Sequence, residues 1–600
     1  MMLYLRRHRT SAIVLRTVAA CVCGAVLFSV PSHARRGIAP VSPSLSARLA
    51  EAPATPLHAW VYFDSKDTSP RAFARALAAL TPRARARRMR GRASIIPIDP
   101  YDLPVRTKFV NEIRASGVHI RNGSRWLNAV SVEADAAGIE RVARLSFVKG
   151  IDAVRFHTIP RVETQPLTET HDPTRGAPHA PTAFNYGPSG PQIRQINVDS
   201  LHESGLSGAG VLIAVLDAGF NNLEHVSLQH LDIQDTWDFV NGDANVDDQL
   251  GQAGSGLHGT LVLSAMAGFA PGHLIGPAYG ASFLLYKTEN TDWERHVEED
   301  AWAAAAERAD SIGADIISTS LGYRSGFTNG DSSYTWRDMD GNTTIVTRAA
   351  DIAAGRGILV VASAGNSGTP FPGENTMNAP ADGDSVLAVA AADLVGARVS
   401  FSSMGPTFDG RTKPDVAALG LSTVCAATTD STSYRTASGT SLSCPLVAGA
   451  AALILEAHPS LTNMNVISRL RSTASRSSAP DNELGWGVID AQSAAFPSAT
   501  HVGHTPLPQT LVVHAPVPNP FNPTTTISYE LPASAHVDLS IYDARGRVVT
   551  RLVHFQQSAG PHEAIWSGHD RTGRPVASGV YLFRLRAGHE QRAGKLTLIK

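Results

Sequence analysis

Residues 438–449 read SGTSLSCPLVAG, and the apolar run AAALILEA (450–457) follows directly. Two serines, a cysteine and a proline therefore stand at the start of a predicted buried helix, where Pro445 is tolerated in the first turn. The small residues allow two interpretations. Either Ser441 is a nucleophile at the helix start, or the stretch is small only because the helix enters a crowded core. The rest of the chain decides between them.

Upstream of this helix, short apolar strands alternate with longer helical patterns. Nearly continuous apolar runs occupy 211–216, 282–287, 314–321, 358–364 and 386–391. Strands of this kind are buried on both faces, which is typical of a parallel sheet covered by helices. We therefore expect an α/β fold, with a parallel sheet and helices on both of its faces, for the middle of the chain.

Three further candidate residues precede Ser441. In open parallel sheets, reactive groups collect where strands reach their carboxyl ends. Asp217 ends the first apolar run, His258 stands before Gly-Thr at the head of a helical pattern, and Asn366 follows the run at 358–364. Taken singly, the acid could cap a turn, the histidine could begin a helix, and the asparagine could suit a turn conformation. Their joint order, Asp–His–Asn–Ser, is the informative feature.

The segments that carry these residues resemble the subtilisin-like serine proteases, or subtilases. The matching segments are VLDAG (215–219), HGT (258–260), SLG (320–322), SAGN (363–366) and GTSLSCPLVAGAAAL (439–453). The resemblance covers about residues 185–495 and implies the subtilisin-like fold for a peptidase domain at 191–496. It also implies that the chain is a serine endopeptidase that works through an acyl-enzyme intermediate.

The resemblance implies a role for each matching residue. A serine hydroxyl needs an adjacent base, so Ser441 is expected to be the nucleophile, His258 its base, and Asp217 the group that orients the histidine. Asn366 is expected to stabilise the oxyanion together with the Ser441 N–H. Two segments are expected to bind substrate: Ser320, Leu321 and Gly322 as a paired strand, and Ser363, Ala364 and Gly365 along the first specificity pocket.

The N-terminal part has a secretory signal and a small domain. Residues 1–34 combine early arginines, an apolar core and a small-residue SHA cleavage site, which predicts export to the cell surface or beyond. Residues 35–156, with a core at about 56–156, read βαββαβ. The resemblance identifies this unit as a ferredoxin-like propeptide that inhibits the protease within its own chain. The alternative is a permanent ligand-binding domain.

Two features of this part are less decisive. Six arginines between the first strand and the first helix of this unit predict a solvated, protease-sensitive loop: Arg83, Arg85, Arg87, Arg88, Arg90 and Arg92. A Pro-rich stretch at 157–190 then predicts an exposed linker and the region of maturation cleavage.

Cys425 and Cys444 could form a disulfide in an exported protein or remain free and buried, and the sequence favours neither.

The C-terminal unit follows a second Pro-rich linker at 497–515. Residues 516–600 contain six strand patterns separated by turns, which predict an antiparallel β-sandwich. The stretch PVPNPFNPTTTISYELP resembles type IX secretion sorting modules and the Ig-like fold of flagellar hook-cap proteins. It implies recognition by an outer-membrane secretion machinery. A permanent adhesion sandwich is the alternative.

The net charge and the motifs of the chain give no support to a nucleic-acid-binding protein, a zinc protease or an α/β-hydrolase. A formal net charge of −1 gives no electrostatic reason to expect nucleic acid as a partner. The chain has no His-Glu-x-x-His motif of zinc proteases, and Ser441 lacks the Gly-x-Ser-x-Gly context of α/β-hydrolases. Acidic turns at 241–248 (NGDANVDD) and 337–342 (RDMDGN) suit calcium as a structural ion, or are ordinary polar turns.

The sequence therefore predicts an exported serine endopeptidase, made as a propeptide-inhibited precursor, that acts on protein or peptide substrates and requires no cofactor. The rival interpretation is a cell-surface pseudoprotease or adhesion protein that binds peptides without cleaving them. The presence of all four chemical positions argues against that rival.

Overall fold

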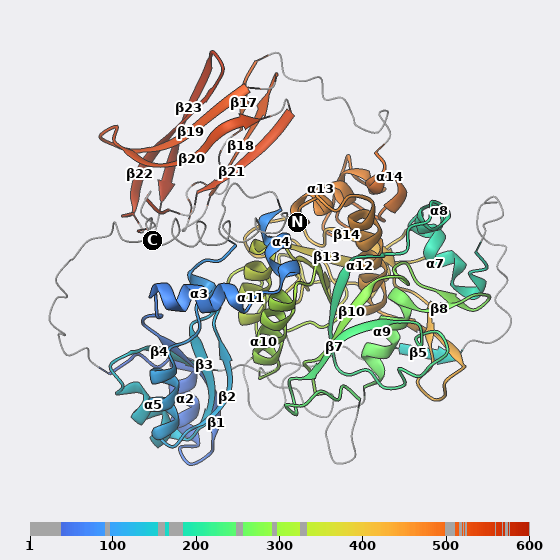
Figure 1. Cartoon of the computed structure of the whole chain (residues 1–600), viewed down its shortest axis with the longest axis horizontal. Coiled ribbons are helices and arrows are strands. Elements are labelled where there is room, and N and C mark those ends of the chain that lie inside the picture. Colours follow the sequence, from blue (N-terminus) through green and yellow to red (C-terminus); the bar gives the residue numbers. More distant parts are fainter. Residues whose placement is uncertain are drawn as a thin grey trace, which may run out of the picture. The chain divides into compact units, whose positions relative to one another are not determined.

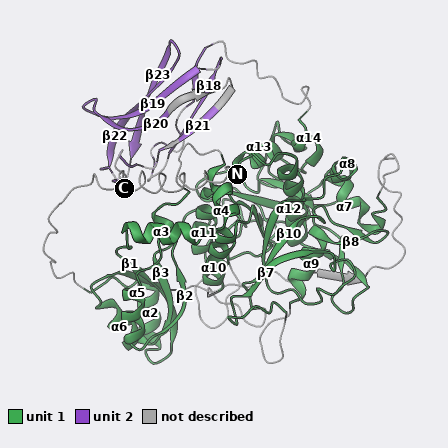
Figure 2. Ribbon diagram, in the orientation of Figure 1, with its two compact units in different colours: residues 1–497 green, residues 498–600 purple. Residues whose placement is uncertain are grey.

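The structure is a computed structural model that divides into two compact units, residues 1–497 and 498–600 (Figure 2). It describes residues 38–90, 97–153, 184–247, 256–290, 297–324 and 333–497, the backbone of 163–166, and most of 510–598. The predicted signal peptide, Arg92 and most of both linkers lie outside these ranges.

The first unit begins with a small α/β domain, hereafter the N-terminal domain. Its four antiparallel strands lie in the order β2-β3-β1-β4 (Figure 1), which matches the predicted βαββαβ arrangement. Its elements are α2 (Pro43–Glu51), β1 (Leu57–Phe63), α3 (Pro70–Ala78), α4 (Pro82–Met89), η1 (Pro100–Asp102), α5 (Thr107–Ala115), β2 (His119–Ser124), β3 (Ala129–Ala134), α6 (Ala136–Ala143) and β4 (Val148–Ala153).

The rest of the first unit is built on a seven-stranded parallel sheet in the order β14-β13-β12-β11-β6-β10-β7. The fold class is therefore confirmed. The strands are β6 (Leu212–Asp217), β7 (Asp232–Asp238), β10 (Ser282–Lys287), β11 (Ile316–Thr319), β12 (Leu359–Ser363), β13 (Val386–Ala392) and β14 (Val416–Leu419).

Helices cover both faces of this sheet, because its strands present apolar side chains to each side. Alternate residues of β6 enter different cores: Ile213 and Val215 pack into the core that includes α9 (Leu257–Ala267) and α12 (Thr440–Ala457). Ala214 and Leu216 pack into the core that includes α10 (Val297–Ile312) and α11 (Ile345–Gly355). This two-sided burial explains the continuous apolar runs of the sequence.

Smaller elements complete this part of the chain. They are β5 (Glu163–Pro166), η2 (Gly187–Ser189), α7 (Gly190–Gln195), α8 (Val198–Glu203), β8 (Phe269–Ala270), β9 (Leu274–Ile275), β15 (Thr423–Ala426), β16 (Tyr434–Ser438), α13 (Asn463–Thr473) and α14 (Ala491–Ala495). Among the described residues, α12 is the one helix long and apolar enough to cross a membrane, and 89% of it is buried inside the protein. Such burial identifies it as a core helix.

The second unit contains two antiparallel sheets, in agreement with the predicted sandwich. Their orders are β17-β18-β21 and β20-β19-β22-β23, and Ile527, Leu539 and Phe583 lie in their common core. The strands are β17 (Val512–Val513), β18 (Thr525–Leu531), β19 (Ala535–Asp543), β20 (Val548–Gln557), β21 (Gly560–Trp566), β22 (Gly579–Ala587) and β23 (Glu590–Leu598).

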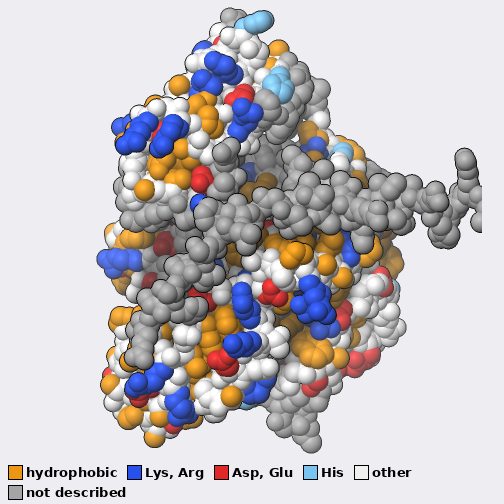
Figure 3. Space-filling view, turned by 60° about the vertical axis from the view of Figure 1, so that its left-hand side comes forward, with side chains coloured by type: hydrophobic (Ala, Val, Ile, Leu, Met, Phe, Trp, Pro, Cys, Tyr) orange, Lys and Arg blue, Asp and Glu red, His pale blue; other side chains and the backbone are white. Residues whose placement is uncertain are grey.

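On the face of the protein drawn in Figure 3, Lys and Arg side chains are scattered among acidic and hydrophobic ones.

The arginine-rich segment of the N-terminal domain is not the solvated loop that its sequence predicts. It forms α4, and the side chains of Arg87 and Arg88 are fully buried. Both guanidinium groups bind Asp310 on α10, and Arg88 also donates to Asp102 at 2.8 Å. The charge run was misread because its buried acidic partner, Asp310, lies more than 200 residues away in the sequence. The segment therefore attaches the N-terminal domain to the large sheet domain.

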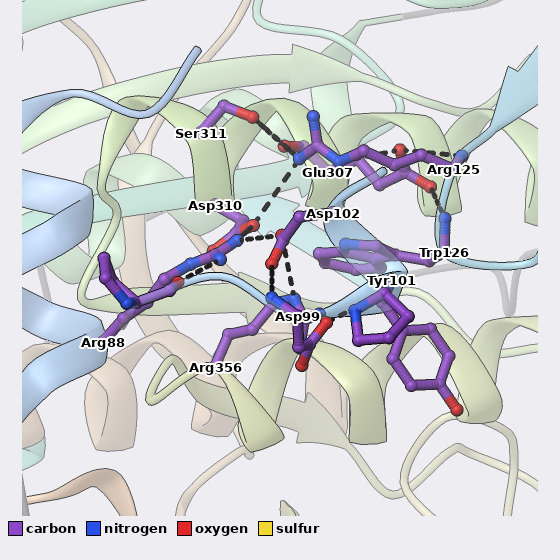
Figure 4. Close-up of polar contacts among 12 residues, drawn as sticks. Arg88, Asp99, Tyr101, Asp102, Arg125, Trp126, Glu307, Asp310, Ser311 and Arg356 are labelled. Carbon is purple, nitrogen blue, oxygen red and sulfur yellow. Dashed lines mark hydrogen bonds and ion pairs between the residues drawn. The ribbon is translucent and has the colours of Figure 1, made fainter. Parts of the chain in front are cut away.

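A second group of contacts extends this attachment (Figure 4). Glu307 on α10 accepts hydrogen bonds from Ser124 Oγ at 2.6 Å and from the Trp126 N–H at 3.1 Å. Burial of this carboxylate raises the pKa of Glu307, although Arg125 opposes the shift. Arg356 donates to Asp99 at 2.6 Å. Trp60 of β1 packs with Ile345 of α11 in the same interface.

Replacing Asp310 by asparagine should destabilise this interface strongly. The change leaves two buried arginines without their shared counter-charge, and breaking a buried pair costs about 3–5 kcal/mol. We expect a loss of that size in the free energy of unfolding of the full chain, measured in urea. Glu140→Gln, which removes an exposed pair with Arg144, should change it by less than about 1 kcal/mol. Equal effects of the two variants would contradict the proposed attachment.

Candidate active site

The carboxyl edge of the parallel sheet brings the predicted site residues together. Asp217 is the last residue of β6, and β11, which ends just before Ser320, is its neighbour in the sheet. Asn366 follows β12, the next strand along. His258 and Ser441 are each the second residue of a helix, α9 and α12, on one face of that sheet. Strand ends and helix starts therefore converge on one place.

Asp217 and His258 form a direct pair. The Nδ1 atom of His258 lies 2.6 Å from Oδ1 of Asp217, and that carboxylate oxygen also accepts the Ala218 N–H at 2.8 Å. Both side chains are buried. Burial alone would lower the pKa of His258, but the charge and hydrogen bond of Asp217 outweigh it and raise this pKa above its ordinary value. Because Nδ1 faces the carboxylate, it carries the proton, and Nε2 is left as the basic nitrogen.

Nε2 of His258 has no hydrogen-bond partner among the described residues. The hydroxyl of Ser441 donates instead to the Ser320 carbonyl at 3.2 Å, while Ser320 Oγ donates to the Ser441 carbonyl at 2.8 Å. The structure therefore pairs the acid with the histidine but leaves the serine hydroxyl bonded to the segment that follows β11. Hydrogen bonds of this kind often tighten only when substrate is bound.

Asn366 is oriented by a residue that the sequence interpretation did not single out. Its Oδ1 accepts hydrogen bonds from the backbone N–H and the hydroxyl of Thr440, both at 2.9 Å. Because a backbone N–H can only donate, the atom facing it must be the oxygen, so Nδ2 points elsewhere. Thr440 Oγ1 also accepts the Gly365 N–H at 3.2 Å. Thr440 stands inside the quoted motif, but only its contacts reveal this role.

Gly439 marks where two donors converge. A Cβ atom placed on Gly439 would lie 3.4 Å from Nδ2 of Asn366 and 3.7 Å from the backbone nitrogen of Ser441. Its φ of 155° is also one that residues with a side chain rarely adopt. A glycine here therefore leaves a small space faced by an amide N–H and a backbone N–H, which together can stabilise a negatively charged oxygen.

The two predicted substrate segments border this site. Ser320, Leu321 and Gly322 follow β11, and Ser363, Ala364 and Gly365 close β12 and the turn after it. The backbone of β5, which lies within the predicted 157–190 linker, pairs antiparallel with β16, with Glu163 opposite Ser438. Part of the linker thus forms a strand beside the segment that leads into α12.

The remaining sequence interpretations have mixed outcomes. Cys425 and Cys444 are free and buried rather than paired, and burial raises the pKa of each thiol to about 12. Asp338 and Asp340 accept hydrogen bonds from their own turns. No group of three or more His, Cys, Asp or Glu side chains that could hold a metal ion occurs in the described ranges, and calcium as a structural ion stays a prediction. Asp248 lies outside those ranges.

Comparisons with known proteins agree with this geometry. Residues 208–487 match the subtilase family, residues 58–170 match the peptidase S8 propeptide domain of Bacteroidota, and residues 519–591 match the FlgD Ig-like domain. Subtilisin DY of Bacillus licheniformis is 33% identical over 306 residues, which cover 50% of this chain and 97% of that protein. Subtilisin E of Bacillus subtilis strain 168 is 33% identical over 315 residues, covering 52% and 73%.

A solved structure shares the fold. Fervidolysin from Fervidobacterium pennivorans, described as a keratinolytic enzyme related to subtilisin, superposes with a TM-score of 0.52 over 90% of this chain and 76% of its own. Its sequence identity is 17%, so this likeness shows the fold alone.

Replacing Asp217 by asparagine should lower the pKa of His258. The change removes the charge that raises this pKa and leaves burial, which lowers it, so the value should fall below the ordinary 6.5. A pH titration of ¹⁵N-labelled imidazoles by NMR, assigned against His258→Ala, measures the shift. His202, whose pKa burial lowers to about 4, serves as the internal control and should not move. An unchanged His258 would show that Asp217 does not set its protonation.

Proposed function

The chain belongs to the subtilase family of serine endopeptidases, and from this premise we propose that Ser441, His258 and Asp217 are the residues with which it hydrolyses peptide bonds. The observation that carries the proposal is the 2.6 Å contact between Nδ1 of His258 and Asp217, which leaves Nε2 free to act as a base. The reaction uses protein groups and water alone.

The first step is attack by Ser441. Its hydroxyl leaves the Ser320 carbonyl and gives its proton to Nε2 of His258, while Oγ attacks the carbonyl carbon of the substrate. Asp217 stabilises the imidazolium that forms and keeps Nδ1 protonated. The imidazolium then protonates the leaving amine, and an acyl-enzyme remains. Water, activated by the same histidine, releases the second product.

The oxyanion that forms during each attack needs donors already in place. Nδ2 of Asn366 and the backbone N–H of Ser441 face the space beside Gly439, and Thr440 holds the amide in this orientation. Donors fixed before the reaction stabilise the developing charge without reorganising. Ser320–Gly322 supplies a backbone with which an extended substrate can pair.

The same premise extends to the other parts of the chain. The N-terminal domain acts as an intramolecular inhibitor, held by the Asp310 and Glu307 contacts, until cleavage within 157–190 releases it. The signal at 1–34 directs export, and the C-terminal sandwich engages an outer-membrane secretion machinery. The protein is thus exported as an inactive precursor whose substrates are proteins or peptides.

Replacing Ser441 by alanine tests the enzyme directly. Wild type should release its N-terminal domain and be labelled by a serine-directed phosphonate, and Ser441→Ala should do neither. Ser443→Ala is the matched control, because Ser443 lies two residues further along α12 and its hydroxyl donates to the Thr440 carbonyl at 3.0 Å. It should keep both activities. If wild type is neither processed nor labelled, the chain is a peptide-binding pseudoprotease instead.

Replacing Asn366 by alanine should lower kcat by about 10²–10³ with little change in KM. The amide contacts the reacting oxygen only once charge develops on it, so its loss affects the transition state more than the bound substrate. Steady-state kinetics on a peptide substrate, normalised by phosphonate titration of active sites, provide the measurement. A variant that retains the wild-type kcat would exclude Asn366 from the oxyanion site.

A further inference from the structure

We propose that Asn378 sets the substrate preference of this protease, selecting a carboxamide side chain (asparagine or glutamine) at P1, the residue on the amino side of the cleaved bond. The inference deepens the proposed function and rests on it, because Asn378 lies between the two segments assigned to substrate. Neither the sequence motifs nor the catalytic machinery accounts for this side chain.

The position of Asn378 is defined by both substrate segments. A Cβ atom on Gly322 would lie 2.6 Å from Nδ2 of Asn378, and a Cβ atom on Gly365 would lie 2.7 Å from the same nitrogen. Two glycines from different strand ends therefore leave room for one amide. The Asn378 N–H donates to the Ala364 carbonyl at 3.1 Å, and the next residue, Ala379, exchanges backbone hydrogen bonds with Tyr323.

The amide of Asn378 lacks a partner. The residue is only 3% exposed, yet no hydrogen bond links either of its side-chain polar atoms to the described parts of the chain. Buried amides are nearly always paired, because leaving one unpaired costs free energy. Neither polar atom of the Asn378 side chain is both unpaired and fully closed off from solvent. The unpaired amide therefore remains open on one side. The missing partner can therefore come from a bound molecule.

The chemistry of the amide selects that partner. A carboxamide offers donors and an acceptor at once, so it can exchange two hydrogen bonds with a second carboxamide. A carboxylate could only accept and an ammonium could only donate, and each would place an unpaired charge in a buried space. An aliphatic side chain would leave the amide of Asn378 unpaired.

A neighbouring hydroxyl adds to this polar floor. Ser403 Oγ lies 2.8 Å from the Cβ position of Gly365. It accepts the Ser367 N–H at 3.1 Å, which leaves its own proton available to donate. Together, Asn378 and Ser403 give the space behind Gly365 a neutral, hydrogen-bonding character.

The test compares substrates of equal shape. Peptides that differ only at P1, with glutamine against methionine and asparagine against leucine, are cleaved by wild type, Asn378→Leu and Asn378→Ala. Asn378→Leu keeps the branched shape and the number of heavy atoms of the side chain, and it removes its hydrogen bonds. The kcat/KM ratio within each pair does not depend on how much of a variant has folded, so partial misfolding does not obscure the result. Ser441→Ala is the blank.

We expect wild type to favour the carboxamide of each pair by about tenfold. Asn378→Leu should abolish or reverse that preference, and Asn378→Ala should reduce it. A wild-type ratio of one or less, or a preference that survives in Asn378→Leu, would overturn the inference while leaving the protease assignment intact. If wild type cleaves none of the peptides and does not react with the phosphonate, the proposed function itself fails.

Discussion

Seven strands that run in one direction end at one edge of the sheet, and the chemistry of this protein depends on that alignment. Asp217 ends β6, and Ser320 and Asn366 follow β11 and β12, the next two strands of the sheet. Neighbouring strands lie about 4.8 Å apart. Two helices then begin at the same edge and add His258 and Ser441. Because each residue occupies an end of a rigid, buried element, its position needs little further support.

The Asp217–His258 pair illustrates how burial is offset. A buried carboxylate is costly unless it is paired and hydrogen-bonded, and Asp217 has both His258 and the Ala218 N–H. A similar balance holds the N-terminal domain, where Asp310 is shared by two buried arginines. In one place the charge tunes a proton acceptor, and in the other it joins two domains. Burial makes both interactions stronger than they would be in water.

Local pattern predicted the central strands well, because β6, β10, β12 and β13 are apolar on both faces. It did not find β7 or β14, which lie at the two edges of the sheet. β7 reads DIQDTWD and exposes much of its length, while β14 has only four residues. β7 lacks the two-sided burial that produces a continuous apolar run, whereas β14 is buried and apolar but too short to stand out. The prediction of a solvated loop for the arginines of α4 was wrong for a related reason: their buried partner Asp310 lies far away in the sequence, so the local pattern does not indicate it.

The sequence by itself determined the fold class and the order of Asp217, His258, Asn366 and Ser441, because these depend on local motifs and on strand periodicity. Tertiary structure alone decided how these residues meet: Thr440 turning the amide of Asn366, Ser441 resting on the Ser320 carbonyl, two free cysteines, and Asn378 between two glycines. The Thr440–Asn366 and Ser441–Ser320 contacts join residues 74 and 121 positions apart in the chain. Their formation depends on how elements pack, which no local pattern of residues encodes.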